Sequence, residues 1–350
     1  MSAAVSVTAA QHRAALTSRL KVARAITIVS WVLYVIGSLL LATSVYFIIV
    51  NDHAVRESAA HAQAQTQQWP SPDRKKMFDE AVQYNNSLPS RFGGAIPADM
   101  RNDENQPLES LDSTYLSTGG TVMATISIPS ISVTVPVYHT TLDDALDRGA
   151  GHVYGTALPV GQNGTLSAIA AHSGGVQGLL FSRLSELKNG GFIYVNVFGS
   201  TQAYQVVNIV TVKPEQAASV FEAQRKVASA DTRSDIPAPN KAGSARISLM
   251  TCTPIGVNTR RLIVTAQRVS TPHPAPPISQ VRDVKLIALI AMIIVLILAV
   301  ILAVIIHVVK RRRRAQAAQA AQHAQHAQRA QQPQHAQRAE NVEKKEVHHA

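Results

Sequence analysis

Two long apolar runs, one near each end of the chain, restrict the fold more than any other feature of the sequence. Residues 25–50 and 286–309 contain no Asp, Glu, Lys or Arg. Each run exceeds the roughly 20 residues that a helix needs to cross a bilayer, and the first is too long for the apolar region of a cleaved signal peptide. Basic residues precede the first run and follow the second. Since basic residues favour the cytoplasmic side, the sequence predicts two spans, both termini in the cytoplasm and residues 51–285 outside.

The positive charge of the chain lies at its two ends. The formal net charge is +11, of which residues 1–24 contribute +4 and residues 310–350 contribute +6. The external part, residues 51–285, holds twenty basic and nineteen acidic residues and is nearly neutral. The basic composition therefore reflects the membrane flanks, and it does not predict binding to nucleic acid.

The external part is predicted to be mainly β. Alternating β-rich patterns predict strands. Short segments with the features of a helix predict helices at 72–88, 142–147, 178–187 and 216–227. Seven or eight short strands indicate a closed barrel or a sandwich, and the pattern alone leaves both open. The strands are expected at 122–128, 133–138, 165–171, 192–197, 203–212, 247–251 and from 262 onward.

Cys252 is the only cysteine of the chain, and it follows the predicted strand 247–251. Pro254 and Gly256 then form a turn, and the pair Arg260 and Arg261 opens the next strand. A lone cysteine is often a small buried hydrophobic residue. An unpaired cysteine outside the cytosol instead indicates a reactive thiol, and a nearby cation favours its nucleophilic thiolate form.

An acyl-transfer site built on a thiol also needs an acid/base and a donor for the developing oxyanion. Three of the histidines between the spans lie in predicted stalk or linker segments (His53, His61 and His273), which leaves His139, His152 and His172. His172 is favoured because it ends a predicted strand just before a Ser-Gly-Gly turn, and His152 is the reserve candidate. Arg260 and Arg261 point to opposite faces of a strand, so only one of them can face the thiol.

The run Thr251-Cys-Thr-Pro-x-Gly-x-Asn-Thr-x-Arg-Leu262 closely resembles the active-site segment of class C sortases, the pilus-assembling transpeptidases of Gram-positive bacteria. Ala171-His-Ser-Gly174 resembles their catalytic Gly-His-x-Gly, with alanine in place of the first glycine. The resemblance implies an eight-stranded β-barrel over about residues 120–270. It also implies Cys252 as nucleophile, His172 as acid/base and Arg261 as oxyanion donor, with the Thr251 hydroxyl assisting at the substrate site.

The resemblance further implies the reaction and the partners. A sortase cleaves an LPxTG-like sorting signal through a thioester and joins it to an amine, which in class C is a pilin lysine, with no metal or organic cofactor. Two alternatives stay open: a sortase that anchors surface proteins to cell-wall peptide, and a non-enzymatic membrane scaffold or receptor. A class C lid is expected within 89–118, yet that segment contains no Asp-Pro-aromatic motif. Its anchor would then be Phe92 or Met100, or the lid would be loose or absent.

These expectations define seven segments along the chain. They are a basic cytoplasmic segment (1–24), a span (25–50), a stalk with helix and lid (51–118), the barrel (119–270), a Pro-rich linker (271–285), a second span (286–309) and a basic Ala/Gln/His-rich cytoplasmic tail (310–350).

Overall fold

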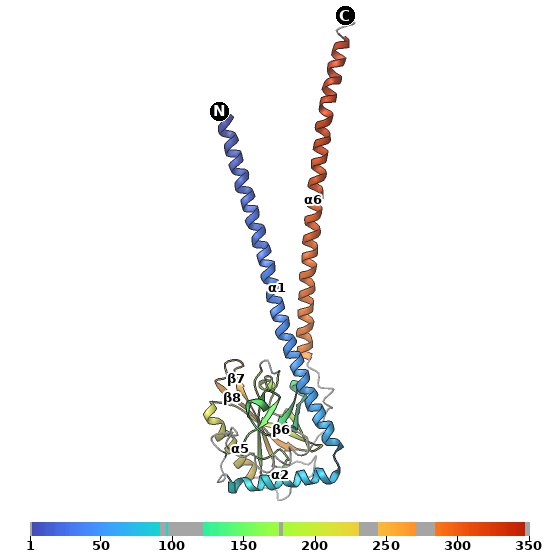
Figure 1. The fold of residues 1–350 in the computed structure, drawn as a ribbon. Helices are drawn as coiled ribbons and strands as arrows, with labels where there is room; N and C mark the ends of the chain where they lie inside the picture. Colours follow the sequence, from blue (N-terminus) through green and yellow to red (C-terminus); the bar gives the residue numbers. More distant parts are fainter. Residues whose placement is uncertain are drawn as a thin grey trace. The chain divides into compact units, whose positions relative to one another are not determined.

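The computed structural model describes residues 2–91, 96, 122–174, 178–230, 244–270 and 284–346. The chain divides into two compact units, residues 1–282 and residues 283–350. The second unit is described by one long helix, α6 (Val284–Glu346), which contains the second apolar run. The first unit contains a long N-terminal helix and all the strands (Figure 1). The predicted lid residues Phe92 and Met100 lie outside the described residues.

The strands of the first unit form a closed eight-stranded barrel, which confirms the fold that the resemblance implies. The strand order around the barrel is β1-β2-β3-β4-β7-β8-β6-β5. Two neighbouring pairs, β2–β3 and β4–β7, are parallel, and the other pairs are antiparallel. The strands are β1 (Val122–Ile128), β2 (Val133–Tyr138), β3 (Ala150–His152), β4 (Leu166–Ala170), β5 (Phe192–Val197), β6 (Ser200–Val212), β7 (Arg246–Thr253) and β8 (Arg260–Val269).

Short helices connect and cover the strands. They are η1 (Pro129–Ile131), α4 (Asp143–Leu146), η2 (Leu184–Glu186), η3 (Pro214–Gln216) and α5 (Ala217–Ala230). The helix predicted at 178–187 is reduced to the single turn η2. Gly178 there adopts a φ of 115° and Leu180 a φ of 34°, and this left-handed backbone is incompatible with a right-handed helix.

The barrel strands bury alternate side chains in two clusters. The interior cluster includes Ile126, Ile193 and Ile247, each fully buried. The second cluster lies on the outer face of β4 and β8, where Phe221 of α5 packs against Leu166, among others. Because side chains alternate between the two faces of a strand, residues of β4 and β7 that point outward lie beneath α5 rather than in the interior.

Two N-terminal helices complete the first unit. Helix α1 (Ser2–Gln68) contains the first apolar run and continues without a break through residues 51–68, where Val55 and Ala59 are buried against the barrel. The predicted stalk is thus a helix with one buried face. Helix α2 (Ser71–Arg91) follows the Ser-Pro-Asp start expected of a helix N-terminus, and its Met77 and Ala81 join the interior cluster.

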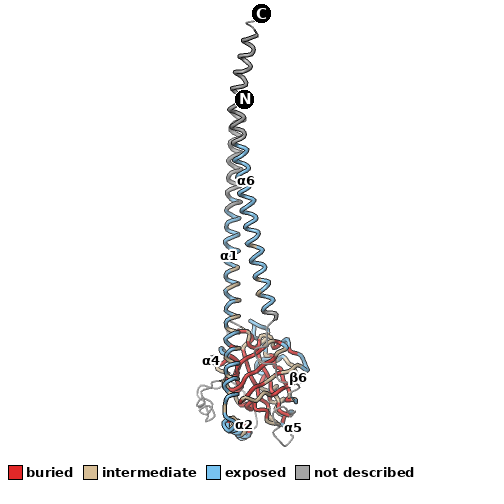
Figure 2. The backbone as a smooth tube through the Cα atoms, turned by 90° about the vertical axis from the view of Figure 1, so that its right-hand side faces the viewer, coloured by how far each residue is buried: buried red, intermediate tan, exposed pale blue. Residues whose placement is uncertain are grey.

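The two apolar runs differ from the barrel in their exposure. Figure 2 shows buried residues concentrated in the barrel, whereas the described residues of the apolar runs in α1 and α6 are mostly exposed. Two helical stretches, Ala25–Gln68 and Ile287–Gln322, are long and apolar enough to cross a membrane. Large apolar side chains without cover in these helices are consistent with a lipid environment.

Candidate active site

The register of two parallel strands brings Cys252 and His172 to the same end of the barrel. Ala170, the last residue of β4, pairs with Met250 of β7. Continuing this register by two residues leads from Ala170 to His172 and from Met250 to Cys252. Because strand side chains repeat every two residues, both side chains emerge on the outer face of the barrel wall. Both residues line the same pocket, of about 310 Å³.

Arg261 joins this pocket from the neighbouring antiparallel strand. Cys252 of β7 and Arg261 of β8 are directly paired, so their side chains lie on the same face of the sheet. Arg261 lines the pocket, and Arg260 does not. One guanidinium nitrogen, Nη1, donates to the carbonyls of Asn258 and Arg260, each at 3.2 Å. The guanidinium is therefore held at the base of the β7–β8 hairpin by backbone acceptors.

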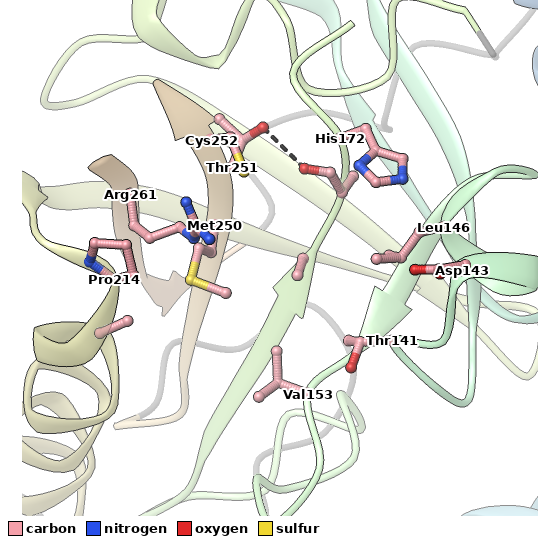
Figure 3. A pocket seen from close by; sticks show the side chains of 13 residues that line it. Thr141, Asp143, Leu146, Val153, His172, Pro214, Met250, Thr251, Cys252 and Arg261 are labelled. Atoms are coloured by element: carbon pink, nitrogen blue, oxygen red, sulfur yellow. Dashed lines mark hydrogen bonds between the residues drawn. The ribbon is translucent and has the colours of Figure 1, made fainter. Parts of the chain in front are cut away.

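The pocket has two walls (Figure 3). Cys252 and Arg261 form one wall with Pro214, and His172 lies on the other wall next to α4. Nε2 of His172 is 3.7 Å from Oδ1 of Asp147, the C-cap residue that follows α4. Asp147 is not among the site residues predicted from the sequence. Its only sequence signal is its place in an acidic helical turn, Asp-Asp-Ala-Leu-Asp, ahead of the predicted catalytic strand.

The Thr251 hydroxyl lies within the barrel wall. Thr251 is 4% exposed, and its Oγ1 donates a hydrogen bond of 2.8 Å to the carbonyl of Ala171. Thr251 precedes the cysteine and Ala171 precedes the histidine, so this bond ties together the two strand ends that carry them. The geometry gives Thr251 a positioning contact, and the expected role of its hydroxyl at the substrate site stays a prediction.

The loop after β4 is fixed to the β7–β8 hairpin. The hydroxyl of Ser173, a buried residue, donates to Oδ1 of Asn258 at 3.2 Å. The carbonyl of His172 accepts a hydrogen bond from the backbone N–H of Phe181, which is fully buried. His172 thus sits between two anchored points, which restricts its backbone before any substrate binds.

His152, the reserve candidate, lies outside the pocket lining and is buried. Burial lowers the pKa of His152 to about 3, with a smaller contribution from the neighbouring His139. Its Nε2 is 3.0 Å from the Ala157 carbonyl and 3.1 Å from Oγ1 of Thr156. Because the Thr156 hydroxyl already donates to the Val153 carbonyl, Nε2 carries the proton and donates. A neutral buried imidazole with a structural hydrogen bond has no access to a substrate.

Nothing in the described pocket resembles a metal site. The described part of the chain contains no group of three or more His, Cys, Asp or Glu side chains that could hold a metal ion. The pocket instead combines a thiol, an imidazole and a guanidinium. That set can attack a carbonyl, transfer a proton and stabilise an oxyanion.

Comparison with known proteins finds a family match for the barrel. Residues 126–269 match the Sortase domain family. Sortase A of Bacillus anthracis is 27% identical over 150 residues, which cover 43% of this chain and 61% of that relative. Two solved structures are each 34% identical: sortase A from Corynebacterium diphtheriae (63% of this chain, 95% of that chain, TM-score 0.48) and sortase C-1 from Actinomyces oris (56% and 97%, TM-score 0.44). The family match includes Cys252, His172 and Arg261, so the part of the chain that carries the candidate site, residues 126–269, matches a sortase domain.

Proposed function

We propose that this protein is a membrane-anchored cysteine transpeptidase that cuts an LPxTG-like sorting signal and joins it to an amine. The observation that carries the proposal is the convergence of Cys252, His172 and Arg261 on one pocket at the end of the parallel β4–β7 pair. These residue types supply the three groups that cysteine acyl transfer needs. The match of residues 126–269 to the Sortase domain family supports the same reaction class.

In the first half-reaction, the Cys252 thiolate attacks the carbonyl carbon of the Thr–Gly bond. The carbonyl oxygen becomes an oxyanion, which the Arg261 guanidinium stabilises with N–H donors. His172 donates a proton to the glycine nitrogen as the C–N bond breaks, and a thioester on Cys252 remains. Apart from the two backbone contacts of Nη1, the described residues offer Arg261 no further hydrogen-bond partner, so other donors can serve the oxyanion.

In the second half-reaction, an amine attacks the thioester carbonyl and His172 accepts its proton. The C–S bond breaks, and Cys252 leaves as the thiolate, which restores the enzyme. Asp147 beside His172 gives the imidazole a carboxylate partner that helps to hold the ring in place. Both side chains are partly exposed, so we expect this contribution to be modest.

For the acceptor, we propose a pilin lysine, as in class C sortases. A second apolar helix after the barrel and the Thr-Pro-x-Gly-x-Asn run that follows Cys252 support this subclass. Anchoring to cell-wall peptide is the alternative, and the absence of an Asp-Pro-aromatic motif from 89–118 favours it. We further propose that both termini are cytoplasmic and that the barrel lies on the external face, as the charged flanks indicate.

Mass spectrometry of residues 51–285 tests the reaction. The fragment keeps Val55 and Ala59, which pack on the barrel. We expect an LPxTG peptide to form a covalent adduct on Cys252, an added amine to convert that adduct to a new amide, and Cys252→Ala to form none. Comparison of a pilin-derived lysine peptide with a cell-wall peptide as acceptor decides the subclass. If no adduct forms, even after deletion of residues 89–118, the protein is not a transpeptidase. The proposal is then replaced by the alternative of a non-enzymatic membrane scaffold or receptor.

A further inference from the structure

The tip of the β7–β8 hairpin carries two exposed apolar side chains beside the active site. Residues 254–259 connect the strands, and Ile255 and Val257 are 61% and 63% exposed. Among the described residues from 51 to 270, only Val207 and Val227 are other large aliphatic residues in the exposed class, and both are less exposed. Among the described residues from 51 to 270, the two most exposed large apolar side chains therefore share one loop. We call residues 254–259 the hairpin tip.

The hairpin tip is an ordered structure. The backbone N–H groups of Val257 and Asn258 both donate to the Pro254 carbonyl, at 3.1 and 2.9 Å. The Asn258 side chain accepts the hydrogen bond from Ser173, which ties the tip to the loop after His172. The exposure of Ile255 and Val257 is thus set by a fixed turn, which presents both side chains outward without the entropy cost of ordering a loop.

The apolar side chains of the tip stand outside the catalytic pocket. The pocket lining ends at Cys252 on β7 and resumes at Arg261 on β8, and it includes no residue of the tip. A β-carbon added to Gly256 would find open space, with no described atom within 4 Å. A peptide seated in the pocket therefore has no need to cover the tip, and another surface is required to remove Ile255 and Val257 from water.

The tip lies close to the point where α1 leaves the apolar run. A β-carbon built on Gly178 would be 3.5 Å from the backbone nitrogen of Asp52, which follows the run that ends at Val50. A β-carbon built on Gly174 would be 3.9 Å from Cγ2 of Ile255. Gly174 and Gly178 are four residues apart, which limits their Cα separation to about 15 Å. These contacts and the length of chain between the two glycines place Ile255 within about 25 Å of Asp52, where α1 leaves the apolar run.

We propose that the hairpin tip is a second membrane contact, in which Ile255 and Val257 insert into the interfacial region of the bilayer. This inference rests on the proposed membrane anchoring through α1. Apolar side chains reach about 5–10 Å into the boundary between headgroups and acyl chains. Arg260, exposed at the base of the tip, supplies a cation for anionic headgroups. The contact holds the mouth of the catalytic pocket at the lipid surface and orients the barrel on its anchor.

The depth of a nitroxide label tests this contact in the full chain. Because Cys252 is the only native cysteine, Cys252→Ala combined with Val257→Cys gives a single labelling site. Cys252→Ala with Val227→Cys gives a matched control at an exposed valine of α5, and Cys252→Ala with Leu39→Cys marks the apolar run. Each protein is placed in nanodiscs of phosphatidylcholine and phosphatidylglycerol. Collision of the label with oxygen is compared with its collision with a water-soluble nickel complex by electron paramagnetic resonance.

We expect the oxygen-to-nickel collision ratio to be several-fold higher at position 257 than at position 227, and highest at position 39. Equal, water-like ratios at 257 and 227 with a lipid-like ratio at 39 overturn the proposed contact and leave the anchor intact. A water-like ratio at 39 overturns the anchoring itself. A label at 257 that is water-exposed alone and becomes immobilised when LPxTG peptide is added overturns the lipid contact and assigns the tip to the substrate.

Discussion

At the scale of single residues, Arg260 and Arg261 form a matched pair for testing the oxyanion donor. They are neighbours on β8, and only Arg261 lines the pocket opposite Cys252. Lysine keeps the charge and loses the planar fork of donors. We expect Arg261→Lys to lower kcat/KM for an LPxTG peptide by about 10²–10³, the usual effect of removing one oxyanion donor. Arg260→Lys should stay close to the wild-type value in detergent. Steady-state kinetics measure both, and equal losses would refute the assignment.

Thr251 permits a test that separates positioning from substrate binding. Its hydroxyl bonds the Ala171 carbonyl, so Thr251→Val removes the tie between the strand ends that carry Cys252 and His172. We expect kcat to fall by about tenfold, equivalent to about 1.4 kcal/mol, with KM nearly unchanged. Thr251→Ser keeps the hydroxyl and should restore kcat. A rise in KM with an unchanged kcat would instead show that the hydroxyl contacts the substrate.

His152 should make the external domain sensitive to acid. Its pKa is lowered from 6.5 to about 3 in the folded protein, so the unfolded chain binds one more proton between these values. The stability that depends on keeping His152 neutral is therefore fully present above about pH 6.5, and it is lost as the pH falls toward 3. Between pH 7 and pH 5, we expect the free energy of unfolding of the wild type to fall by about 2 kcal/mol more than that of His152→Gln. Urea unfolding of residues 51–285, followed by tryptophan fluorescence, measures the difference. Equal losses in the two proteins would show that this buried imidazole does not cause the acid sensitivity.

At the scale of elements, α1 both carries the apolar run and packs on the barrel. Ala59 is fully buried and its neighbour Ala60 is exposed, which gives two adjacent alanines on one helix with opposite environments. Ala59→Gln should destabilise the external domain by about 1–3 kcal/mol through overpacking, and Ala60→Gln should have little effect. Urea unfolding of residues 51–285 tests both. A stable Ala59→Gln variant would indicate that α1 does not dock on the barrel.

The strands were predictable where alternation was clear. The ranges expected for β1, β2 and β5 agree with the structure, because their apolar side chains face a continuous interior. β3 was missed because it has only three residues within a glycine-rich turn. Its parallel partner β2 and its antiparallel partner β4 are the strands on either side of it in the sequence. The choice between barrel and sandwich depends instead on pairs between distant strands, such as β1 with β5 and β4 with β7, and a local sequence pattern does not contain these pairings.

The candidate site was likewise predictable only in part. Cys252 and His172 were predictable as strand-end residues, and the structure places both in one pocket. Their meeting depends on the parallel register of β4 with β7, which no local pattern encodes. Asp147 and the tie from Thr251 to Ala171 were missed because they are contacts between separate elements. The chemical type of each candidate residue could thus be predicted from the sequence, whereas its position relative to the other candidates depends on the fold.

At the scale of the whole molecule, the charged flanks predict the orientation in the membrane. Basic residues influence topology mainly within about 15–20 residues of a span. The run from Lys310 to Arg314 directly follows the second apolar run, whereas Arg338, Lys344 and Lys345 lie farther away. The near run should therefore keep the C-terminus in the cytoplasm, and the distant residues should contribute little.

Reporter fusions after residue 350 measure this orientation. We expect a fluorescent protein to be active there and alkaline phosphatase to be inactive, because the phosphatase matures only outside the cytoplasm. Replacing all five residues of 310–314 with glutamine should increase phosphatase activity, since the second span then has no strong cytoplasmic flank. The matched change of Arg338, Lys344 and Lys345 to glutamine should leave it low. An active phosphatase on the unchanged chain would place the C-terminus outside and overturn the two-span topology, because an external barrel between two spans requires both termini on the same side.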